Sequence, residues 1–238
     1  VFKIQPSPAA EVETIIRHVR KNYEDANIVV VHDGKAEIKS VLDYYQQLLV
    51  KGNNTWSVLD YDKHASKLSS KLKDGKTNVV INLVDKGSSK DNENYSKRLL
   101  SSLGLKKDID IVLFADYSWI EFPHLDYTLL EKFKYHFTLS HFNDYTNLNF
   151  VNFVKDYREN FKTEPDRIYA ALGYDIAMFF VNSLMKNGED FIHNPNLSRV
   201  DNIIGNFYFE RKDENFGYQN KKTTIYKMED YKIRAVIE

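Results

Sequence analysis

The sequence predicts an α/β fold: a parallel sheet with helices on both faces, followed by C-terminal helices and a small β unit. Four short apolar segments rich in Val, Ile and Leu are predicted strands, at residues 27–32, 56–61, 78–84 and 109–115. Segments with helical periodicity separate them. Because strands that alternate with such helices form right-handed βαβ units, the sheet is predicted to be parallel and covered on both faces.

The predicted helices have recognisable ends. Ser7 is the expected N-cap of the first helix, and Pro8 occupies its first turn. Apolar residues recur at helical spacing in the second helix, between Ile38 and Leu49. Glycines follow this stripe and the next two, where helices commonly end: Gly52, Gly75 and Gly104.

The pattern changes after Trp119. We predict a short helix at 125–133, a further strand at 135–142 and two long helices at 148–161 and 166–186, the last of which ends at Gly188. Three β-segments are then predicted, at 202–210, 223–228 and 233–237. The expected organisation is a parallel α/β lobe at 1–142, paired helices at 143–190 and C-terminal β-segments at 191–238 that return to the lobe.

Composition narrows the function classes. The 33 Lys and Arg against 34 Asp and Glu give a formal net charge of −1, so no overall basic field attracts nucleic acid or an anionic membrane. No apolar run is long enough to predict a membrane span. Cysteine is absent, which excludes disulfides and thiolate chemistry. The chain opens at Val1 without an initiator Met or a signal peptide, and we expect it to be a trimmed piece of a longer protein.

Motifs for catalysis and metal binding are absent. The seven histidines form no H-E-x-x-H pattern, and His136 and His141 fall on opposite faces of a predicted strand. Ser118 is the best candidate nucleophile, yet Asp116 and Ile120 occupy the positions where a hydrolase nucleophile elbow needs small residues. We therefore expect a protein that is not an enzyme and has no metal site and no cofactor.

Phosphate-binding patterns are also incomplete. Gly34 and Lys35 follow the first strand without a glycine-rich loop, and G-x-G-x-x-G occurs nowhere. The strand-end acids Asp33 and Asp116 are similar to the acidic cluster of phospho-receiver domains. That fold needs a lysine after its fifth strand, whereas Lys86 lies one strand too early.

Several segments resemble one known family. They are VFKIQPS at 1–7, NIVVVHD at 27–33, YAALGYD at 169–175 and GNFYF at 205–209. In this order they resemble the type I periplasmic binding proteins, the Leu/Ile/Val-binding and receptor ligand-binding family, from the point where the chain first enters the second lobe. The resemblance implies a type I periplasmic-binding-protein lobe that covers the second lobe and the C-terminal part only.

Two departures from the family limit what the resemblance implies. The first lobe is missing before Val1, so the ligand cleft would have at most one wall here. The helix after the segment 27–33 opens with Gly34-Lys35 where the family usually has Tyr-Gly. The ligand class is therefore left open. In the family-like segment 169–175, Gly173, Tyr174 and Asp175 are predicted to be structural, with Gly173 packed closely against a neighbouring backbone.

The predicted ligand site lies at the ends of the strands. In open parallel sheets the ligand crevice is outside the carboxyl ends of the strands. The candidate ligand-binding residues there are Asp33, Gly34, Lys35, Asp85, Lys86, Asp116, Tyr117 and Trp119. Acids, lysines and aromatic rings together suit a polar, partly apolar small molecule. The alternative is that these residues cap helices and solvate the edge of the sheet.

The resemblance implies a non-catalytic, extracytoplasmic solute-binding or sensing domain. It would lie in the periplasm or be associated with the cell envelope. Its ligand, by analogy an amino-acid-like molecule, would be held between two lobes. Two alternatives stay open. One is a degenerate scaffold for protein or cell-wall contact, as in relatives fused to LysM modules. The other is a flavodoxin-like α/β enzyme.

The helix at 166–186 carries a prediction of its own. It is apolar on nearly every face, so it must be buried on more than one side. We expect a homodimer, a missing first lobe, or a C-terminal hairpin folded over this helix.

Overall fold

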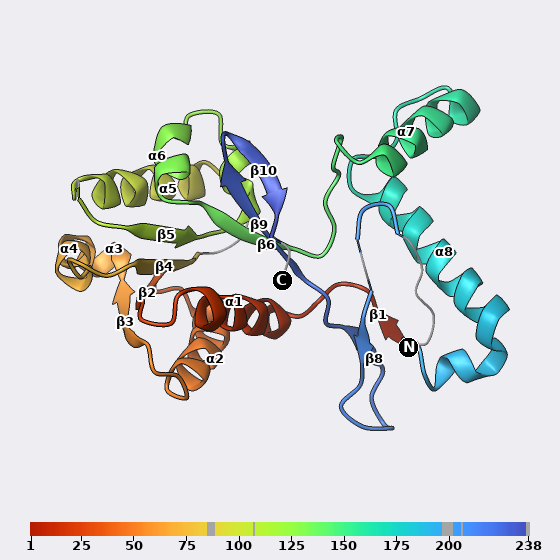
Figure 1. Ribbon diagram of the computed structural model, residues 1–238, viewed down its shortest axis with the longest axis horizontal. Coiled ribbons are helices and arrows are strands. Elements are labelled where there is room, and N and C mark those ends of the chain that lie inside the picture. The colour runs from red at the N-terminus through yellow and green to blue at the C-terminus, as the bar shows by residue number, and fades with distance from the viewer. Residues whose placement is uncertain (85–88, 107, 197–201, 206, 237–238) are drawn as a thin grey trace. The chain divides into compact units, whose positions relative to one another are not determined.

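The computed structural model describes residues 1–84, 89–106, 108–196, 202–205 and 207–236 (Figure 1). The chain divides into two compact units. Unit 1 comprises Val1–Ala10 and Ser140–Thr223, and unit 2 comprises Glu11–Leu139 and Thr224–Glu238. The bounds of these units differ from those of the three segments expected from the sequence. Residues 1–10 group with residues 140–223, and residues 224–238 group with the large sheet.

Unit 2 is built on a seven-stranded sheet of order β10-β9-β6-β5-β4-β2-β3. The strands are β2 (Asn27–His32), β3 (Thr55–Asp60), β4 (Asn78–Leu83), β5 (Ile111–Phe114), β6 (His136–Leu139), β9 (Thr224–Glu229) and β10 (Lys232–Ala235). The first five are parallel, and β9 and β10 add an antiparallel edge. The α/β fold with a mostly parallel sheet is confirmed.

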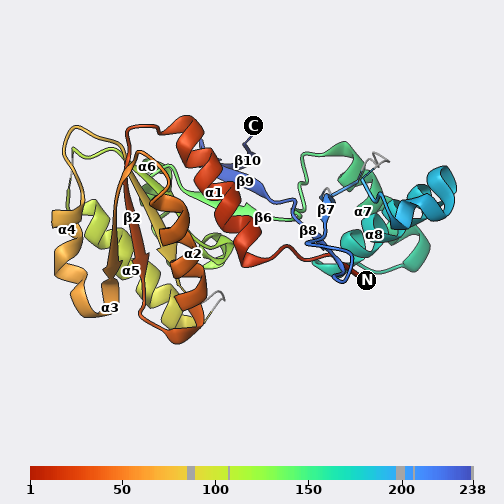
Figure 2. The ribbon, with the colours of Figure 1, turned by 90° about the horizontal axis from the view of Figure 1, so that it is seen from below.

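Helices cover both faces of this sheet (Figure 2). The helices α1 (Pro8–Asn22) and α2 (Lys39–Leu49) pack on one face, where β2 contributes Ile28 and Val30. Four others pack on the opposite face, where β2 contributes Val29 and Val31: α3 (Tyr61–His64), α4 (Leu68–Lys71), α5 (Lys90–Gly104) and α6 (Tyr127–Lys132). Short 3-10 turns complete the unit: η1 (Ala36–Ile38), η2 (Ala65–Lys67) and η3 (Tyr117–Glu121). The continuous apolar runs in the strands follow from burial on two faces.

Unit 1 contains a small sheet and two long helices. Its strands β1 (Phe2–Lys3), β8 (Tyr218–Asn220) and β7 (Phe209–Glu210) are ordered β1-β8-β7. Its helices are α7 (Leu148–Phe161) and α8 (Tyr169–Asn187), and the 3-10 turn η4 (Gly188–Ile192) follows α8. Aromatic rings form one of its cores: Phe2 stacks on Tyr218 with ring centres 4.8 Å apart, and Phe179 lies 5.4 Å from Phe209.

Several predicted boundaries need correction. Helix α8 begins at Tyr169 rather than Asp166, because the Asp166 carboxylate accepts hydrogen bonds from the backbone N–H groups of Ile168 (2.9 Å) and Tyr169 (2.7 Å) and so acts as a cap. The predicted β-segment at 202–210 holds only β7 and one bridge between His141 and Gly205. Strand β8 was not predicted; it is only three residues long, too short for an alternating pattern.

One expectation about α8 is wrong. Among the described residues, no atom lies within 4 Å of a Cβ added to Gly173, so no neighbouring backbone packs closely against it. The C-terminal strands β9 and β10 extend the large sheet of unit 2 through β6. In the described residues no helix is long and apolar enough to span a membrane.

Candidate functional site

The carboxyl ends of the parallel strands of unit 2 share one edge of the sheet. Asp33 follows β2, and Asp116 follows β5 after one further residue. In the sheet, β4 lies between these two strands. A strand spacing of about 4.8 Å therefore separates their ends by about 10 Å. Asp85 and Lys86, which were predicted at the end of β4, lie outside the described residues.

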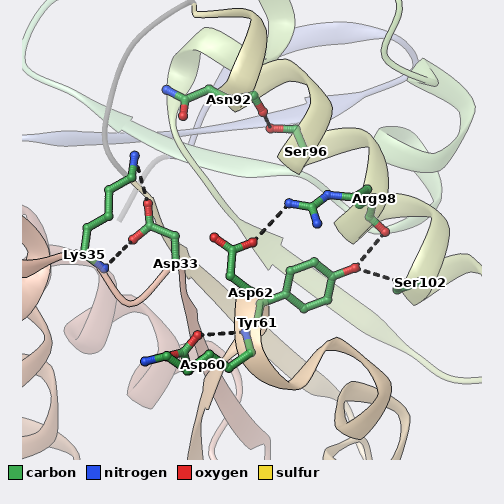
Figure 3. A network of polar contacts seen from close by, with 10 residues as sticks. Asp33, Lys35, Asp60, Tyr61, Asp62, Asn92, Ser96, Arg98 and Ser102 are labelled. Carbon is green, nitrogen blue, oxygen red and sulfur yellow. Dashed lines mark hydrogen bonds and ion pairs between the residues drawn. The ribbon is translucent and has the colours of Figure 1, made fainter.

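Asp33 and Lys35 form the first pair at this edge (Figure 3). The Asp33 side chain is only 3% exposed, and its Oδ1 accepts a hydrogen bond from the backbone N–H of Lys35 at 3.2 Å. Its Oδ2 lies 3.3 Å from Lys35 Nζ, in an ion pair that lacks hydrogen-bond geometry. The Lys35 side chain is half exposed. The buried Asp33 carboxylate is thus paired with the ammonium group of a lysine whose side chain reaches the solvent.

Gly34 fits against the second acid of the edge, Asp60. Its φ is +75°, a region that glycine adopts without strain, and a Cβ there would lie 2.8 Å from Asp60 Oδ2. Asp60 is the N-cap of α3: its Oδ1 accepts a hydrogen bond from the Lys63 backbone N–H at 3.1 Å, and its Oδ2 lies 3.0 Å from Lys63 Nζ. Partial burial opposes ionisation, but these contacts and the charge of His32 hold the pKa of Asp60 below its ordinary value.

The end of β3 brings further polar side chains to the same edge (Figure 3). Asp62 pairs with Arg98 at 3.0 Å. Tyr61 donates to the Arg98 carbonyl at 2.9 Å, and its hydroxyl also bonds to Ser102 Oγ at 2.7 Å. Asp60, Tyr61 and Asp62 are not among the site residues predicted from the sequence. The predicted strand at 56–61 ends at these residues, so the rule applied to its neighbours could have found them.

Two buried polar atoms near this edge have no hydrogen-bond partner among the residues that the structure describes. They are the Tyr95 hydroxyl and Asn82 Oδ1, on side chains of residues that are 4% and 8% exposed. Asn82 pairs with Val31 in the register of β2 and β4. Burial raises the pKa of Tyr95, and the negative charges of Asp62 and Asp33 raise it further. An orphaned buried polar atom is costly unless something binds it.

The remaining predicted site residues have structural contacts. Asp116 Oδ1 accepts a hydrogen bond from the Ser118 backbone N–H at 3.0 Å and thereby caps η3. The ring of Tyr117 lies 5.3 Å from that of Phe137. Trp119 is 3% exposed and stacks on Tyr135 at 6.1 Å, so its indole belongs to the apolar core. The structure therefore brings together Asp33, Gly34 and Lys35, and it adds Asp60 and Asp62 to them.

Unit 1 contains a separate groove between α7 and α8, with a volume of about 610 Å³. Phe153, Tyr157 and Tyr174 line it together with asparagines such as Asn149 and Asn182. Among the described residues, no group of three His, Asp or Glu side chains is arranged to hold a metal ion.

Comparison with known proteins gives matches by structure alone. No family model and no curated protein matches the sequence. A putative branched-chain amino acid ABC transporter from Rhodospirillum rubrum matches with a TM-score of 0.64 and 11% identity, over 99% of this chain and 67% of that one. An ABC transporter substrate-binding protein from Desulfitobacterium hafniense, in complex with Leu, matches with a TM-score of 0.57 and 14% identity, over 98% and 66%.

A third similar structure is a fatty acid ABC transporter substrate-binding protein from Thermomonospora curvata, with a TM-score of 0.55, 11% identity and coverage of 98% and 63%. The chain thus spans about two thirds of the length of these proteins. At such low identity the matches show the fold. Together with the sheet order and the family-like segments, they show that the chain has the type I periplasmic binding protein fold.

Proposed function

We propose that this chain is a non-catalytic, extracytoplasmic solute-binding domain whose ligand lies at the carboxyl edge of the large sheet. The observation that carries the proposal is the pairing of Asp33 with Lys35 directly after β2, at the edge where open parallel sheets bind ligands. The similar structures support it: one is an ABC transporter substrate-binding protein in complex with Leu, and another is a branched chain amino acid ABC transporter from Thermus thermophilus with bound valine.

The chemistry of the edge suits binding better than turnover. Its carboxylates and cations are held in pairs, Asp33 with Lys35, Asp60 with Lys63 and Asp62 with Arg98. Charged pairs of this kind recognise polar groups through directed hydrogen bonds. Closure of a second lobe over the edge would complete the ligand contacts, as in hinge-type binding proteins.

A solute screen tests the proposal. We would measure the thermal unfolding midpoint of the chain with leucine, valine, glutamate, agmatine and octanoate, each from micromolar to millimolar concentration. A ligand at a hundred times its Kd stabilises the folded state by about 2.7 kcal/mol, so a saturable rise in the midpoint is expected for at least one solute. Fluorescence of Trp119, which lies in η3 beside Asp116, gives a second readout at the same edge. The absence of any saturable shift with all five solutes would contradict the proposal.

A second candidate function, a scaffold for protein contact, is favoured by the apolar surface of α8. Val181, Leu184 and Met185 are 51%, 49% and 81% exposed there. Exposed apolar groups at this density are typical of a surface that another protein covers. In this reading a second copy or a further lobe covers α8. Light scattering at several concentrations distinguishes a homodimer from a monomer.

A further inference from the structure

Three acid–base pairs lie at the ends of β2 and β3, and one of them differs in how the acid is satisfied. Asp60 receives two contacts from Lys63, at 3.1 Å from the backbone N–H and 3.0 Å from Nζ. Asp62 receives a hydrogen bond from Arg98 at 3.0 Å, and its side chain is 44% exposed. Water and close donors therefore satisfy both carboxylates.

Asp33 is less well satisfied. Its Oδ1 accepts one hydrogen bond, from the Lys35 backbone N–H at 3.2 Å. Its side chain is only 3% exposed, and among the described residues its Oδ2 has no hydrogen bond, since Lys35 Nζ lies 3.3 Å away without the required geometry. A carboxylate removed from water needs hydrogen-bond donors to remain charged at low cost. The Asp33 carboxylate is therefore an acceptor with unused capacity, and the lysine beside it is half exposed.

Two further buried oxygens lie on the same side of the sheet. Val31 and Val80 belong to the core that α5 covers, and by the period of two in a strand Asn82 faces that side as well. Among the described residues, Asn82 Oδ1 has no hydrogen-bond partner. The Tyr95 hydroxyl comes from α5, also has no partner in the part of the chain that the structure describes, and is close enough to the Asp33 carboxylate for that charge to raise the pKa of Tyr95. The oxygens of Asp33 and Asn82 can only accept hydrogen bonds, and the hydroxyl oxygen of Tyr95 can also accept one.

From this juxtaposition we propose that Asp33, Asn82 and Tyr95 form a subsite for a cationic hydrogen-bond donor of the ligand, an alkylammonium or guanidinium group. Such a group offers several N–H donors and the charge that a buried carboxylate needs. An anionic group would be repelled by Asp33. The ligand's cation takes the place of the Lys35 ammonium, so Lys35 competes with it. This inference rests on the proposed solute-binding function and specifies the chemistry of its ligand.

The test compares cationic and neutral probes on matched variants. Agmatine and putrescine are titrated calorimetrically against 1,4-butanediol, in which uncharged hydroxyls replace the two ammonium groups of putrescine, with the wild-type chain and with Asp33→Asn and Asp74→Asn. Both variants remove one negative charge from unit 2, but the Asp74 side chain is 87% exposed and lies outside the proposed site. Asp33→Asn should weaken agmatine binding about tenfold or more, whereas Asp74→Asn should change it little. Lys35→Met, which removes the competing ammonium, should strengthen it.

Tyr95→Phe is the variant that guards against loss of folding. It removes one oxygen that has no partner, so the fold should be kept while agmatine binding weakens. Binding of 1,4-butanediol equal to that of putrescine, or equal losses in Asp33→Asn and Asp74→Asn, would overturn the cationic subsite while leaving the solute-binding function in place. Failure of every solute to bind would overturn the function itself and the subsite with it.

Discussion

The Asp175 carboxylate accepts a hydrogen bond from the backbone N–H of Ile203 at 2.7 Å, and its second oxygen accepts one from Ile204 at 2.9 Å. Asp175 lies inside α8 and is 1% exposed. Burial raises the pKa of this carboxyl, and the backbone N–H groups of Ile203, Ile204 and Gly205 oppose the rise. One side chain thus fastens the segment before β7 to α8, which explains an acid within an otherwise apolar helix.

Replacing Asp175 should release this segment. In Asp175→Asn the side-chain NH₂ faces backbone donors, so at least one buried N–H loses its acceptor, and we expect unit 1 to lose about 2–3 kcal/mol of stability. Hydrogen exchange of the Ile203 and Ile204 amides measures the effect directly, as faster exchange. Asp156→Asn, at an exposed position of α7, is the control and should change stability by less than about 0.5 kcal/mol. Unchanged protection of both amides in Asp175→Asn would contradict the assigned contact.

Gly34 should be intolerant of a side chain for two separable reasons. Its φ of +75° costs an alanine about 1–2 kcal/mol, and the new Cβ would lie 2.8 Å from Asp60 Oδ2, which Lys63 holds in place. Gly75 has nearly the same φ, +72°, but no atom lies within 4 Å of its Cβ position.

The pair Gly34→Ala and Gly75→Ala therefore separates backbone strain from collision. Both should be destabilised in urea unfolding followed by tryptophan fluorescence, and Gly34→Ala by more, because Asp60 must also move. Equal losses would show that Asp60 yields freely and that Gly34 is needed only for its backbone conformation.

His136 should make the stability of unit 2 depend on pH. Burial is the main cause that lowers its pKa from 6.5 to about 4, and the charge of the nearby His18, whose ring centre is 5.8 Å away, acts in the same direction. Because the folded-state pKa is below the unfolded value, this histidine contributes full stability above pH 6.5. That contribution is lost as the pH falls towards about 4, where the loss approaches about 3 kcal/mol.

The variant His136→Phe keeps the contact with Phe114, which lies 4.9 Å away, and removes the titrating group. Its free energy of unfolding should be flatter than that of the wild type between pH 6.5 and 4. Trp56 and Trp119 both belong to unit 2 and report its unfolding by fluorescence. His64→Gln, at an exposed position, serves as the control and should follow the wild-type profile. Parallel profiles for wild type and His136→Phe would refute the role given to His136.

The sequence was most informative where a segment is buried on two faces. Strand β2 has the predicted bounds, 27–32, because its apolar residues from Ile28 to Val31 are alternately buried in the two cores on either face of the sheet. Strands β7 and β8 have two and three residues and are set by pairing with distant segments, so no local pattern reveals them. The rule that ligands bind beyond the ends of parallel strands predicts Asp33 and Lys35, and at the end of β3 it points equally to Asp60 and Asp62, which were not predicted.

Side-chain environment was harder to predict. Trp119 and Asp33 both follow strands and looked alike as site residues, yet the indole is packed on Tyr135 whereas the carboxylate keeps an unused oxygen. That difference depends on residues far away in sequence. Asp175 was correctly predicted to be structural, but its partners Ile203 and Ile204 lie 28 and 29 residues further along the chain.

Gly173 offers a test of what covers α8. A Cβ there meets nothing within 4 Å, and glycine inside a helix costs about 1 kcal/mol relative to alanine. In the chain by itself Gly173→Ala should therefore raise the stability of unit 1 by up to about 1 kcal/mol, measured by thermal unfolding in far-UV circular dichroism. Gly188→Ala is the matched control at the C-cap of the same helix: its φ of +54° should make it destabilising although its surroundings are equally open.

Light scattering then shows whether Gly173 lies in an interface. The surface around it carries Tyr169, 70% exposed, and Val181, 51% exposed, which a second copy would bury. If the chain forms a homodimer through α8, the absence of a side chain at Gly173 allows close approach, and Gly173→Ala should weaken the dimer. If the dimer persists with unchanged affinity, α8 is not its interface. If the chain is a monomer and Gly173→Ala stabilises it, the homodimer prediction fails, and a further lobe remains as the partner that this apolar surface would fit.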